Sequence, residues 1–251
     1  MRSVVARLWT AGALGLALLS AVGVARADAK GDELVRKIDA ALKSYKTLTV
    51  QYDVTTQEQG REAVKQVVRS NFKGKKQFTE LLAPGDIKGT KALNLSETEM
   101  YVYMPAFRKI RRVASHMSEG GFMGSAYAQH DMNLTQYGGL FTGTIVSEDD
   151  GNWVLKLDKK PDCGLPYGKL ELTVDKKLTL PTRIKFFDEK GQHVKTETRL
   201  DYACTQSVCT AKRQKMVDHT KGDKATRLDQ TDVIVNPDLP DEMFSKRNLQ
   251  R

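Results

Sequence analysis

Short stretches of alternating apolar and polar residues cover most of the chain, and this alternation constrains the fold more than any other feature. A period of two is typical of β-strands with one buried and one wet face. Turn signals separate the stretches, for example at 84–86, 148–151 and 188–191. This arrangement predicts an antiparallel meander rather than alternating strands and helices. The residues expected on the buried faces are Val50, Tyr52, Val54, Met100, Val102, Met104, Trp153, Leu155, Leu157, Leu170, Leu172, Val174, Ile184 and Phe186.

Residues 32–46 have helical spacing instead. Leu34, Ile38 and Leu42 share one side of this segment and charged residues occupy the other, which predicts one amphipathic helix. About ten expected strands therefore offer apolar faces, and one long helix is available to cover them. A sheet of that size closes on itself, packs as a sandwich or curls around a hollow. An apolar hollow would take an apolar ligand, and the pattern alone does not separate the three cases.

The N-terminal residues have the pattern of a secretory signal peptide. Two arginines accompany an apolar run over residues 8–24, and Ala25-Arg26-Ala27 has the form of a cleavage site. A membrane anchor is the alternative, since the run is barely long enough to span a bilayer. The polar residues after the site favour cleavage after Ala27. We therefore expect a signal peptide over 1–27, one exported domain over 28–251 and a periplasmic location.

The charge of the chain excludes one class of partner. Lys and Arg number 40 against 31 Asp and Glu, and this modest excess is spread along the chain, so it does not indicate nucleic-acid binding. It suits a protein that works near anionic lipid head groups. No second long apolar run follows residue 27, so the sequence does not predict a protein with several membrane spans.

Export also permits disulfides. Cys204 and Cys209 are separated by four residues at the expected tip of a hairpin, and we predict a disulfide between them. Zinc is the competing interpretation, but two thiols without a nearby histidine make a poor site. The state of Cys163 stays open.

One segment, residues 104–132, interrupts the meander. It begins with a basic run over 108–112 and continues through glycines that flank Phe122 and Met123. A long glycine-bearing loop with apolar tips is a common form of lid or docking loop, although these two residues equally suit a plug for the core. The basic run either protects an open strand edge or binds phosphate or carboxylate groups.

Motifs for common enzyme classes are missing from the sequence. It contains no G-x-S-x-G, P-loop, H-E-x-x-H or G-x-G-x-x-G pattern. His130 and Asp131, with His116 upstream, are the one group that hints at acid–base or metal chemistry, and a structural role is favoured for them. We expect no catalytic residues, no metal site and no cofactor.

The stretch 101–132 resembles the exported outer membrane lipoprotein-sorting protein family, which is LolA-like and shares the fold type of LolA, LolB and RseB. The chain departs from the family pattern at Ala126, where Asp is usual, and at Ala128 and Gln129. The C-terminal residues also look like the family's ending. The matching positions are Tyr103, Pro105, Arg108, Arg111, Arg112, Phe122, Met123, Gly124, Ser125 and Asp131, then Phe244, Arg247 and Leu249.

The resemblance implies a mainly β fold with some α: a single curved, unclosed antiparallel β-barrel, or half barrel, with an N-terminal amphipathic helix and short lid helices or loops. It implies a monomeric, non-enzymatic periplasmic carrier that binds acyl chains of a lipid or lipoprotein and passes them towards the outer membrane. The transfer partner would be an inner-membrane transporter or an outer-membrane acceptor. A sensor module that binds lipid or an envelope protein is the first alternative. A hydrolase using His116, His130 and Asp131 is the second.

Together these arguments predict one continuous apolar concavity. Phe122 and Met123 should lie near its mouth, and Arg108, Arg111 and Arg112 should meet a head group or a partner outside it. The residues expected to bind lipid are Val50, Tyr52, Val54, Met100, Val102, Met104, Phe122, Met123, Leu155, Leu170, Leu172, Ile184 and Phe186.

Overall fold

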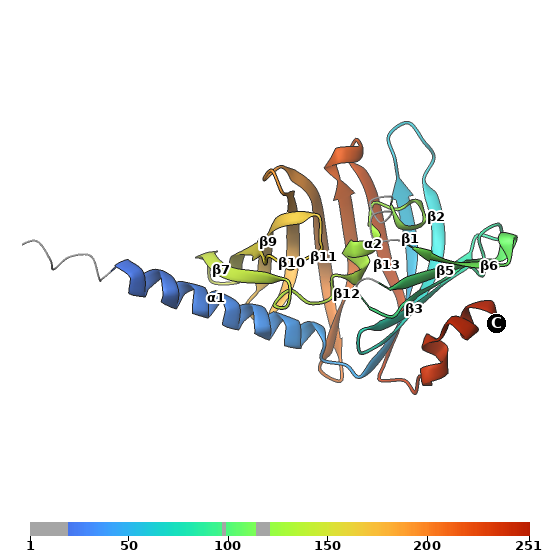
Figure 1. Cartoon of the computed structure of the whole chain (residues 1–251), viewed down its shortest axis with the longest axis horizontal. Helices are drawn as coiled ribbons and strands as arrows, with labels where there is room; N and C mark the ends of the chain where they lie inside the picture. The colour runs from blue at the N-terminus through green and yellow to red at the C-terminus, as the bar shows by residue number, and fades with distance from the viewer. Residues whose placement is uncertain (1–19, 97–98, 114–120) are drawn as a thin grey trace, which may run out of the picture.

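The computed structural model describes residues 20–96, 99–113 and 121–251, and these form one large curved sheet with a long N-terminal helix, α1 (Ser20–Leu42) (Figure 1). The strands found among these residues are β1 (Thr47–Gln57), β2 (Val64–Lys73), β3 (Lys76–Ala83), β4 (Lys91–Asn94), β5 (Met100–Met104), β6 (Lys109–Val113), β7 (Phe141–Glu148), β8 (Asn152–Lys159), β9 (Tyr167–Asp175), β10 (Leu180–Asp188), β11 (His193–Thr205), β12 (Val208–Asp218) and β13 (Lys224–Val235).

The strand order of the sheet is β6-β5-β4-β3-β2-β1-β13-β12-β11-β10-β9-β8-β7. Every neighbouring pair is antiparallel, and most pairs are hairpin neighbours in the sequence. The exception is the pair of β1 and β13, which joins the first strand to the last in the middle of the sheet. Within the described residues β6 and β7 are the two free edges, so the sheet is not closed. The predicted fold class is confirmed.

The connection from β6 to β7 has to pass over one face of the sheet, because these strands lie at opposite edges. We call residues 121–140 the crossing segment; it contains η3 (Phe122–Gly124) and the short helix α2 (Gln129–Asn133). The backbone N–H of Ala126 donates to Thr226 Oγ1 on β13 at 2.8 Å. The crossing segment therefore lies over the centre of the sheet, on the face that we call the inner face.

Helix α1 covers the β7 end of the inner face. Its apolar residues Leu34, Val35 and Ile38 are at most 6% exposed and belong to the main core. The carboxylate of Asp39 accepts the backbone N–H groups of Tyr137 and Gly138 at 2.7 and 2.9 Å. The amphipathic helix is confirmed, but it extends from Ser20 to Leu42 rather than over 32–46, so it begins within the predicted signal peptide.

Two glycines allow α1 to approach β7 closely. A Cβ atom on Gly31 would lie 2.0 Å from the Gly143 carbonyl oxygen, and one on Gly143 would lie 2.5 Å from Val35 Cγ2. We expect Gly143→Val to reduce the free energy of unfolding by about 1–3 kcal/mol, because the helix has to move away from the sheet. Urea unfolding measures the change. Gly139→Ala is the matched control, since nothing lies within 4 Å of that position, and equal losses in both variants would contradict the close contact.

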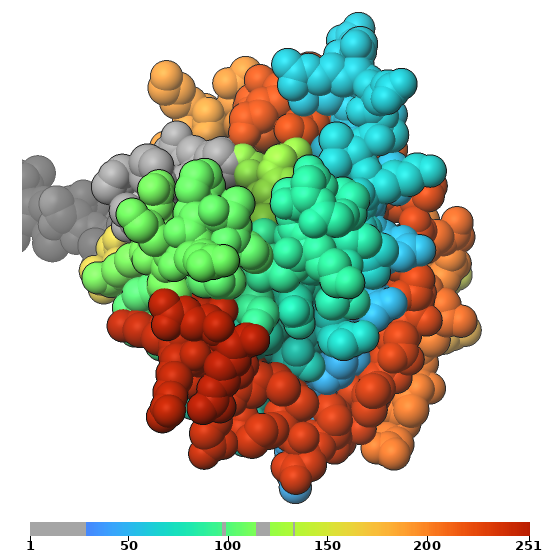
Figure 2. Space-filling view, turned by 90° about the vertical axis from the view of Figure 1, so that its right-hand side faces the viewer, coloured from blue at the N-terminus to red at the C-terminus, as the bar shows by residue number. Residues whose placement is uncertain are grey.

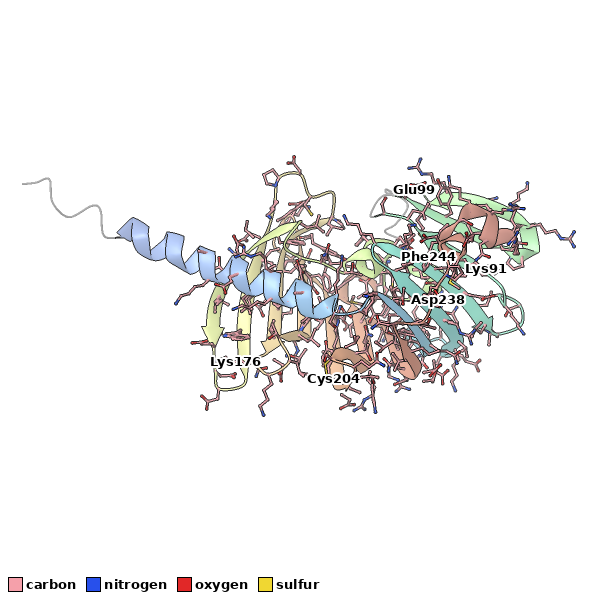
Figure 3. All side chains as sticks on the ribbon, turned by 90° about the horizontal axis from the view of Figure 1, so that it is seen from below. Lys91, Glu99, Lys176, Cys204, Asp238 and Phe244 are labelled. Carbon is pink, nitrogen blue, oxygen red and sulfur yellow. A yellow bond between two sulfur atoms is a disulfide. The ribbon has the colours of Figure 1, made fainter. Side chains whose placement is uncertain are left out.

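The β7–β10 half of the inner face is a solid core, which corrects one expectation. Leu155, Leu170, Leu172, Ile184 and Phe186 are at most 1% exposed and pack with α1 and the crossing segment. They were expected to line a hollow. The expectation failed because α1 lies across exactly this half of the sheet (Figure 3) and fills the space above their strands.

The outer face of the sheet carries the C-terminal segment. Its two short turns, η5 (Asp241–Phe244) and η6 (Lys246–Gln250), follow β13. They place Phe244 near Lys91, on β4, and near Glu99, which directly precedes β5 (Figure 3). Leu239, Phe244 and Leu249 form a second core with residues of β3, β4 and β5. The C-terminal segment therefore shields the side of these strands that faces away from α1.

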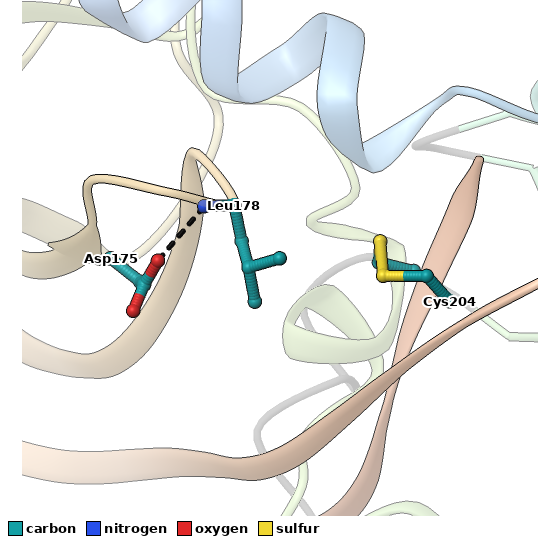
Figure 4. Close-up of a disulfide and its surroundings, with 4 residues drawn as sticks. Asp175, Leu178 and Cys204 are labelled. Atoms are coloured by element: carbon teal, nitrogen blue, oxygen red, sulfur yellow. Dashed lines mark hydrogen bonds between the residues drawn. A yellow bond between two sulfur atoms is a disulfide. The ribbon is translucent and has the colours of Figure 1, made fainter.

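The predicted disulfide is confirmed. Cys204 and Cys209 are directly paired across the β11–β12 hairpin and their sulfurs are bonded. Figure 4 shows this bond beside Leu178, whose backbone N–H donates to the Asp175 carboxylate at 2.8 Å. Cys163 is a free thiol, 5% exposed, in the main core, which settles the question that the sequence left open.

The disulfide closes a short loop, so its expected contribution to stability is small. We expect the double variant C204S/C209S to lose about 2 kcal/mol of unfolding free energy, since the loop-closure entropy removed from the unfolded chain grows with loop length. Thermal unfolding with and without reductant measures the loss. Reductant should destabilise the wild-type protein and leave the double variant unchanged, and an equal response of both proteins would contradict this assignment.

Candidate functional site

A cavity of about 220 Å³ lies between the inner face of the sheet and the crossing segment. Its walls come from the central strands of the sheet, which lie side by side in the order β3, β2, β1, β13, β12 and β11. The end of α1 contributes as well. The apolar residues that line it are Leu42, Leu48, Val54, Val68, Phe72, Leu81, Phe122, Met123, Met132, Leu134, Val208, Ala211 and Leu228.

The sequence explains why space remains here. Helix α1 ends at Leu42, before it reaches the central strands, so the crossing segment alone spans them. Several inward positions hold small residues, and their hydroxyls bond to one another: Ser70 to Thr79 at 3.0 Å, and Thr56 to Thr226 at 2.8 Å. Paired hydroxyls can be buried at little cost. The inner face of the central strands therefore carries small side chains whose polar groups are hydrogen-bonded to one another.

The crossing segment forms the cover of the cavity. Phe122 and Met123, the apolar loop residues singled out in the sequence, both line it. The side-chain amide of Gln66 on β2 donates to the Met123 carbonyl at 3.4 Å. In Figure 2 the yellow-green surface of this segment is recessed between the cyan β1–β2 hairpin and the green β5–β6 hairpin. The two side chains thus lie over the cavity and do not fill the core beneath α1.

A buried polar cluster holds α2 in place. Asp131, whose side chain is 1% exposed, accepts hydrogen bonds from Lys195 Nζ at 2.6 Å, from the Ala128 backbone at 2.7 Å and from the Tyr167 hydroxyl. His130 Nε2 lies 2.9 Å from the same Tyr167 hydroxyl. These contacts occupy the Asp131 carboxylate with structural bonds to β9 and β11. His116, the third member of the predicted acid–base group, lies outside the described residues.

A second buried ion pair lies in the cavity wall. Glu197 and Arg199 alternate along β11, so both face inward, and Arg199 Nε and a terminal guanidinium nitrogen each donate to the Glu197 carboxylate at 3.0 Å. Their side chains are 5% and 16% exposed. Burial disfavours the charged guanidinium, but the Glu197 carboxylate more than offsets this and holds the pKa of Arg199 above its ordinary value. The two side chains carry opposite charges, so the pair has no net charge.

Tyrosine hydroxyls surround this ion pair. Tyr202 donates to the Pro181 carbonyl at 2.7 Å, and Tyr52 accepts from Gln214 Nε2 at 3.4 Å. The Tyr127 hydroxyl is buried, and within the described part of the chain it has no hydrogen-bond partner. Burial raises the pKa of Tyr52 to about 12 and that of Tyr127 well above its ordinary value. These hydroxyls therefore stay neutral at physiological pH. The sequence analysis included Tyr52 among the lipid-binding residues, but it missed the ion pair, Tyr127 and Tyr202.

The predicted lipid-binding residues fall into three groups. Tyr52, Val54, Phe122 and Met123 line the cavity. Four others belong to inward positions of β1 and β5 but do not line it: Val50 and Met100 are buried, and Val102 and Met104 are half-buried. The remaining five, on β8, β9 and β10, form the solid core described above. The hollow is therefore shorter than the continuous concavity expected from the sequence.

The three arginines of the basic run lie outside the cavity and do not share one face. Arg111 pairs with Val102 and Arg112 with Tyr101 across β5 and β6, so they project from opposite faces of the sheet. Arg108 lies in the preceding turn with a left-handed backbone. All three are exposed, with Arg111 and Arg112 on the free edge strand β6 and Arg108 directly before it. This position agrees with protection of an open edge and leaves a contact with a head group untested.

Solved structures with the same architecture cover nearly the whole chain. A DUF1329 family protein from Desulfovibrio piger is 18% identical, with a TM-score of 0.82 over 89% of this chain and 99% of its own. A domain described as that of an outer membrane lipoprotein-sorting protein, from Vibrio parahaemolyticus, is 24% identical, with a TM-score of 0.79 over 89% of this chain and 100% of its own. A LolA superfamily protein from Nitrosomonas europaea is 21% identical, with a TM-score of 0.72 over 87% and 98%.

A family model described as an uncharacterized protein matches residues 73–251, which is more than half of the chain. The chain belongs to the family that this model describes, and its fold is LolA-like. The match begins at the end of β2 and includes the crossing segment, β11 and the C-terminal segment of the LolA-like sheet. A search of curated proteins finds no match.

Two further searches of the described residues are negative. No helix among residues 20–96, 99–113 and 121–251 has both the length and the hydropathy needed to cross a bilayer. Within the same ranges, no group of His, Cys, Asp and Glu side chains is arranged to hold a metal ion.

Proposed function

We propose that this LolA-like protein is a periplasmic, non-enzymatic carrier that binds acyl chains of a lipid or lipoprotein in the central cavity. It would pass them towards the outer membrane, or to or from a membrane transporter. The observation that carries this proposal is the apolar cavity between the inner face of the sheet and the crossing segment. Cavities with mostly apolar walls and a few placed polar groups are the usual sites for apolar ligands.

The size of the cavity supports a carrier that releases its ligand. A water molecule takes up about 30 Å³ of liquid, and a methylene group is of similar size, so a cavity of 220 Å³ holds about seven methylene groups. Burying them contributes about 6 kcal/mol before the costs of ordering the ligand. This is enough to hold one acyl segment in water, and a membrane offers the same apolar environment to accept it.

Two observations that point the same way support the proposed envelope location. One of the similar structures is described as an outer membrane lipoprotein-sorting protein domain, and residues 1–27 have the pattern of a secretory signal. We expect the protein isolated from the periplasm to begin at Asp28, and N-terminal sequencing checks this. Recovery of a membrane-bound protein that still begins with Met1 would contradict the proposed domain over 28–251.

The basic hairpin of β5 and β6 is a candidate contact for an anionic head group or a transfer partner. Arg108, Arg111 and Arg112 are exposed there, and the neighbouring Phe107 is 61% exposed. Such a contact would weaken as salt increases, because exposed charges are screened. It lies outside the cavity, so we propose that it orients the carrier and does not hold the acyl chain.

The proposed carrier has no catalytic role for His130 and Asp131. Asp131 already accepts from Lys195, Tyr167 and the Ala128 backbone, and these bonds hold α2 on the sheet. A carboxylate engaged in this way is a poor general base, since three accepted hydrogen bonds use most of its lone pairs. We therefore propose a structural role for both residues.

Native mass spectrometry of protein purified from the periplasm tests the proposal. We expect a fraction of the molecules to carry a noncovalent adduct with the mass of a lipid or an acylated peptide. Transfer of that adduct to vesicles of phosphatidylethanolamine and phosphatidylglycerol would support a carrier. A protein that is always free of adducts, and that binds no acyl compound in titrations, would contradict it.

A further inference from the structure

The charges of the cavity wall are already neutralised. Arg199 is the one cation among the described lining residues, and its guanidinium donates two hydrogen bonds to Glu197. Asp131 also lines the cavity, and it is paired with Lys195 at 2.6 Å. An anion entering the cavity would lose its hydration and meet two carboxylates with no net positive charge to balance it. The cavity is therefore unsuited to a charged group.

Two tyrosine hydroxyls of the cavity wall, in contrast, have unused hydrogen-bonding capacity. The Tyr127 side chain is 4% exposed and lines the cavity, and its hydroxyl has no partner within the described residues. The Tyr52 hydroxyl accepts one long bond from Gln214, and this bond does not use the proton of the hydroxyl. An unmatched buried hydroxyl is costly unless a ligand or water completes it. Both hydroxyls lie close to the Glu197–Arg199 pair, whose charges act on them.

We infer that the ligand is an uncharged lipid whose single polar oxygen, that of an alcohol or an ester, enters the cavity and bonds to Tyr127 and Tyr52. This inference rests on the proposed carrier function and deepens it. The apolar chain extends over Val54, Val68 and Leu81, away from the ion pair. The Glu197–Arg199 pair excludes ionised fatty acids because its charges are satisfied by each other.

Three probes with eight carbons in the chain distinguish the possibilities: octanol, methyl octanoate and octanoate, the last at a pH where it is ionised. Their affinities for the full-length protein are measured by displacement of the uncharged dye Nile red. We expect octanol and methyl octanoate to bind at least about tenfold more tightly than octanoate, given the cost of burying an uncompensated charge. Equal affinities, or tighter binding of octanoate, would overturn the inference and leave the carrier proposal intact. Failure of all three probes and of the dye to bind would instead count against the carrier itself.

Glu197→Gln tests the role of the ion pair. The substitution frees the charge of Arg199, so the preference for uncharged probes should shrink by about tenfold or reverse. Glu171→Gln is the matched control, because Glu171 is also on the sheet and paired with a cation, Lys185 at 2.6 Å, but does not line the cavity. The ratio of affinities of Glu171→Gln should equal that of the wild-type protein. An unchanged ratio in Glu197→Gln would show that the ion pair does not exclude ionised fatty acids. If Glu197→Gln fails to fold, the inference is tested by the wild-type protein alone, through the ratio of its affinities for octanol and octanoate.

Tyr127→Phe tests the hydrogen bond to the ligand. Because the hydroxyl has no partner in the empty protein, its removal should leave the unfolding midpoint unchanged or higher. The affinity for octanol should nevertheless fall about threefold to tenfold, the effect of one lost hydrogen bond. Tyr103→Phe, in the outer-face core, should leave the affinity for octanol unchanged. Unchanged octanol binding by Tyr127→Phe would show that the hydroxyl does not meet the ligand.

Discussion

Replacing Val54 with aspartate is expected to reduce the affinity for a fluorescent acyl ester about 100-fold, or by about 3 kcal/mol. Val54 is 5% exposed, lines the cavity and pairs with Leu228 across β13, another lining residue. A carboxylate at this position places an uncompensated charge beside the acyl chain. Fluorescence titration measures the affinity, and circular dichroism confirms that the variant is folded.

The next residue on the same strand supplies the control. Thr55 projects from the opposite face and pairs with Arg227 and Lys65, so Thr55→Asp adds the same charge between two cations and should leave binding unchanged. Should Val54→Asp not fold, Val54→Asn introduces a milder polar group at the same place and should still weaken binding by tenfold or more. Equal binding by the folded Val54 and Thr55 variants would remove the cavity as the acyl site.

Asp131→Asn is expected to cause the largest loss of stability in the chain, about 3–5 kcal/mol in the free energy of unfolding. The substitution leaves Lys195, whose side chain is 9% exposed, charged and unpaired. It also replaces one acceptor oxygen with an NH2 donor, so the Ala128 backbone and the Tyr167 hydroxyl can no longer donate to separate oxygens of this side chain. Urea unfolding measures the loss, and limited proteolysis should show faster cleavage within the crossing segment.

A surface ion pair provides the comparison. Lys156 and Asp158 lie 2.9 Å apart, but their side chains are 46% and 47% exposed, so Asp158→Asn should cost less than about 1 kcal/mol. Replacing both buried partners, as Asp131→Leu with Lys195→Met, should recover most of the stability because no uncompensated charge remains. Similar losses in Asp131→Asn and Asp158→Asn would mean that the buried cluster does not hold the cover in place.

The type of fold was predictable because it depends on local pattern. Period-two alternation and turn residues specify antiparallel hairpins wherever they occur, and each of β8, β9 and β10 was expected near its observed place. The single helical pattern over 32–46 likewise predicted α1. The disulfide followed from Cys204 and Cys209 facing each other across a hairpin.

The location of the cavity was not predictable, because it depends on long-range placement. Nothing local tells that β1 pairs with β13, or that α1 covers the β7 half of the sheet and ends before the centre. Leu155 and Val54 have the same alternating surroundings in the sequence, yet one lies in a solid core and the other lines the cavity. The filling of an inner face is decided by elements that are distant in sequence.

Strand β11 shows a second limit of predicting the buried face of a strand from alternating apolar and polar residues. Its inward residues are Lys195, Glu197 and Arg199, and Leu200 on the other side is 49% exposed. Alternation would place the apolar residues inside, so the charged ones were not considered. The reversal is possible because Asp131, from a segment remote in sequence, pairs with Lys195, and because Glu197 and Arg199 neutralise each other.

The pairing of β1 with β13 has a consequence for the order of events during folding. The two strands at the seam are nearly the whole chain apart in sequence, with Leu48 opposite Val235. All other strand pairs join neighbours along the chain, so each flank of the sheet can assemble from its own hairpins. The cavity straddles the seam and therefore does not exist until β13 arrives. The proposed binding of acyl chains therefore requires a sheet that is complete to its last strand.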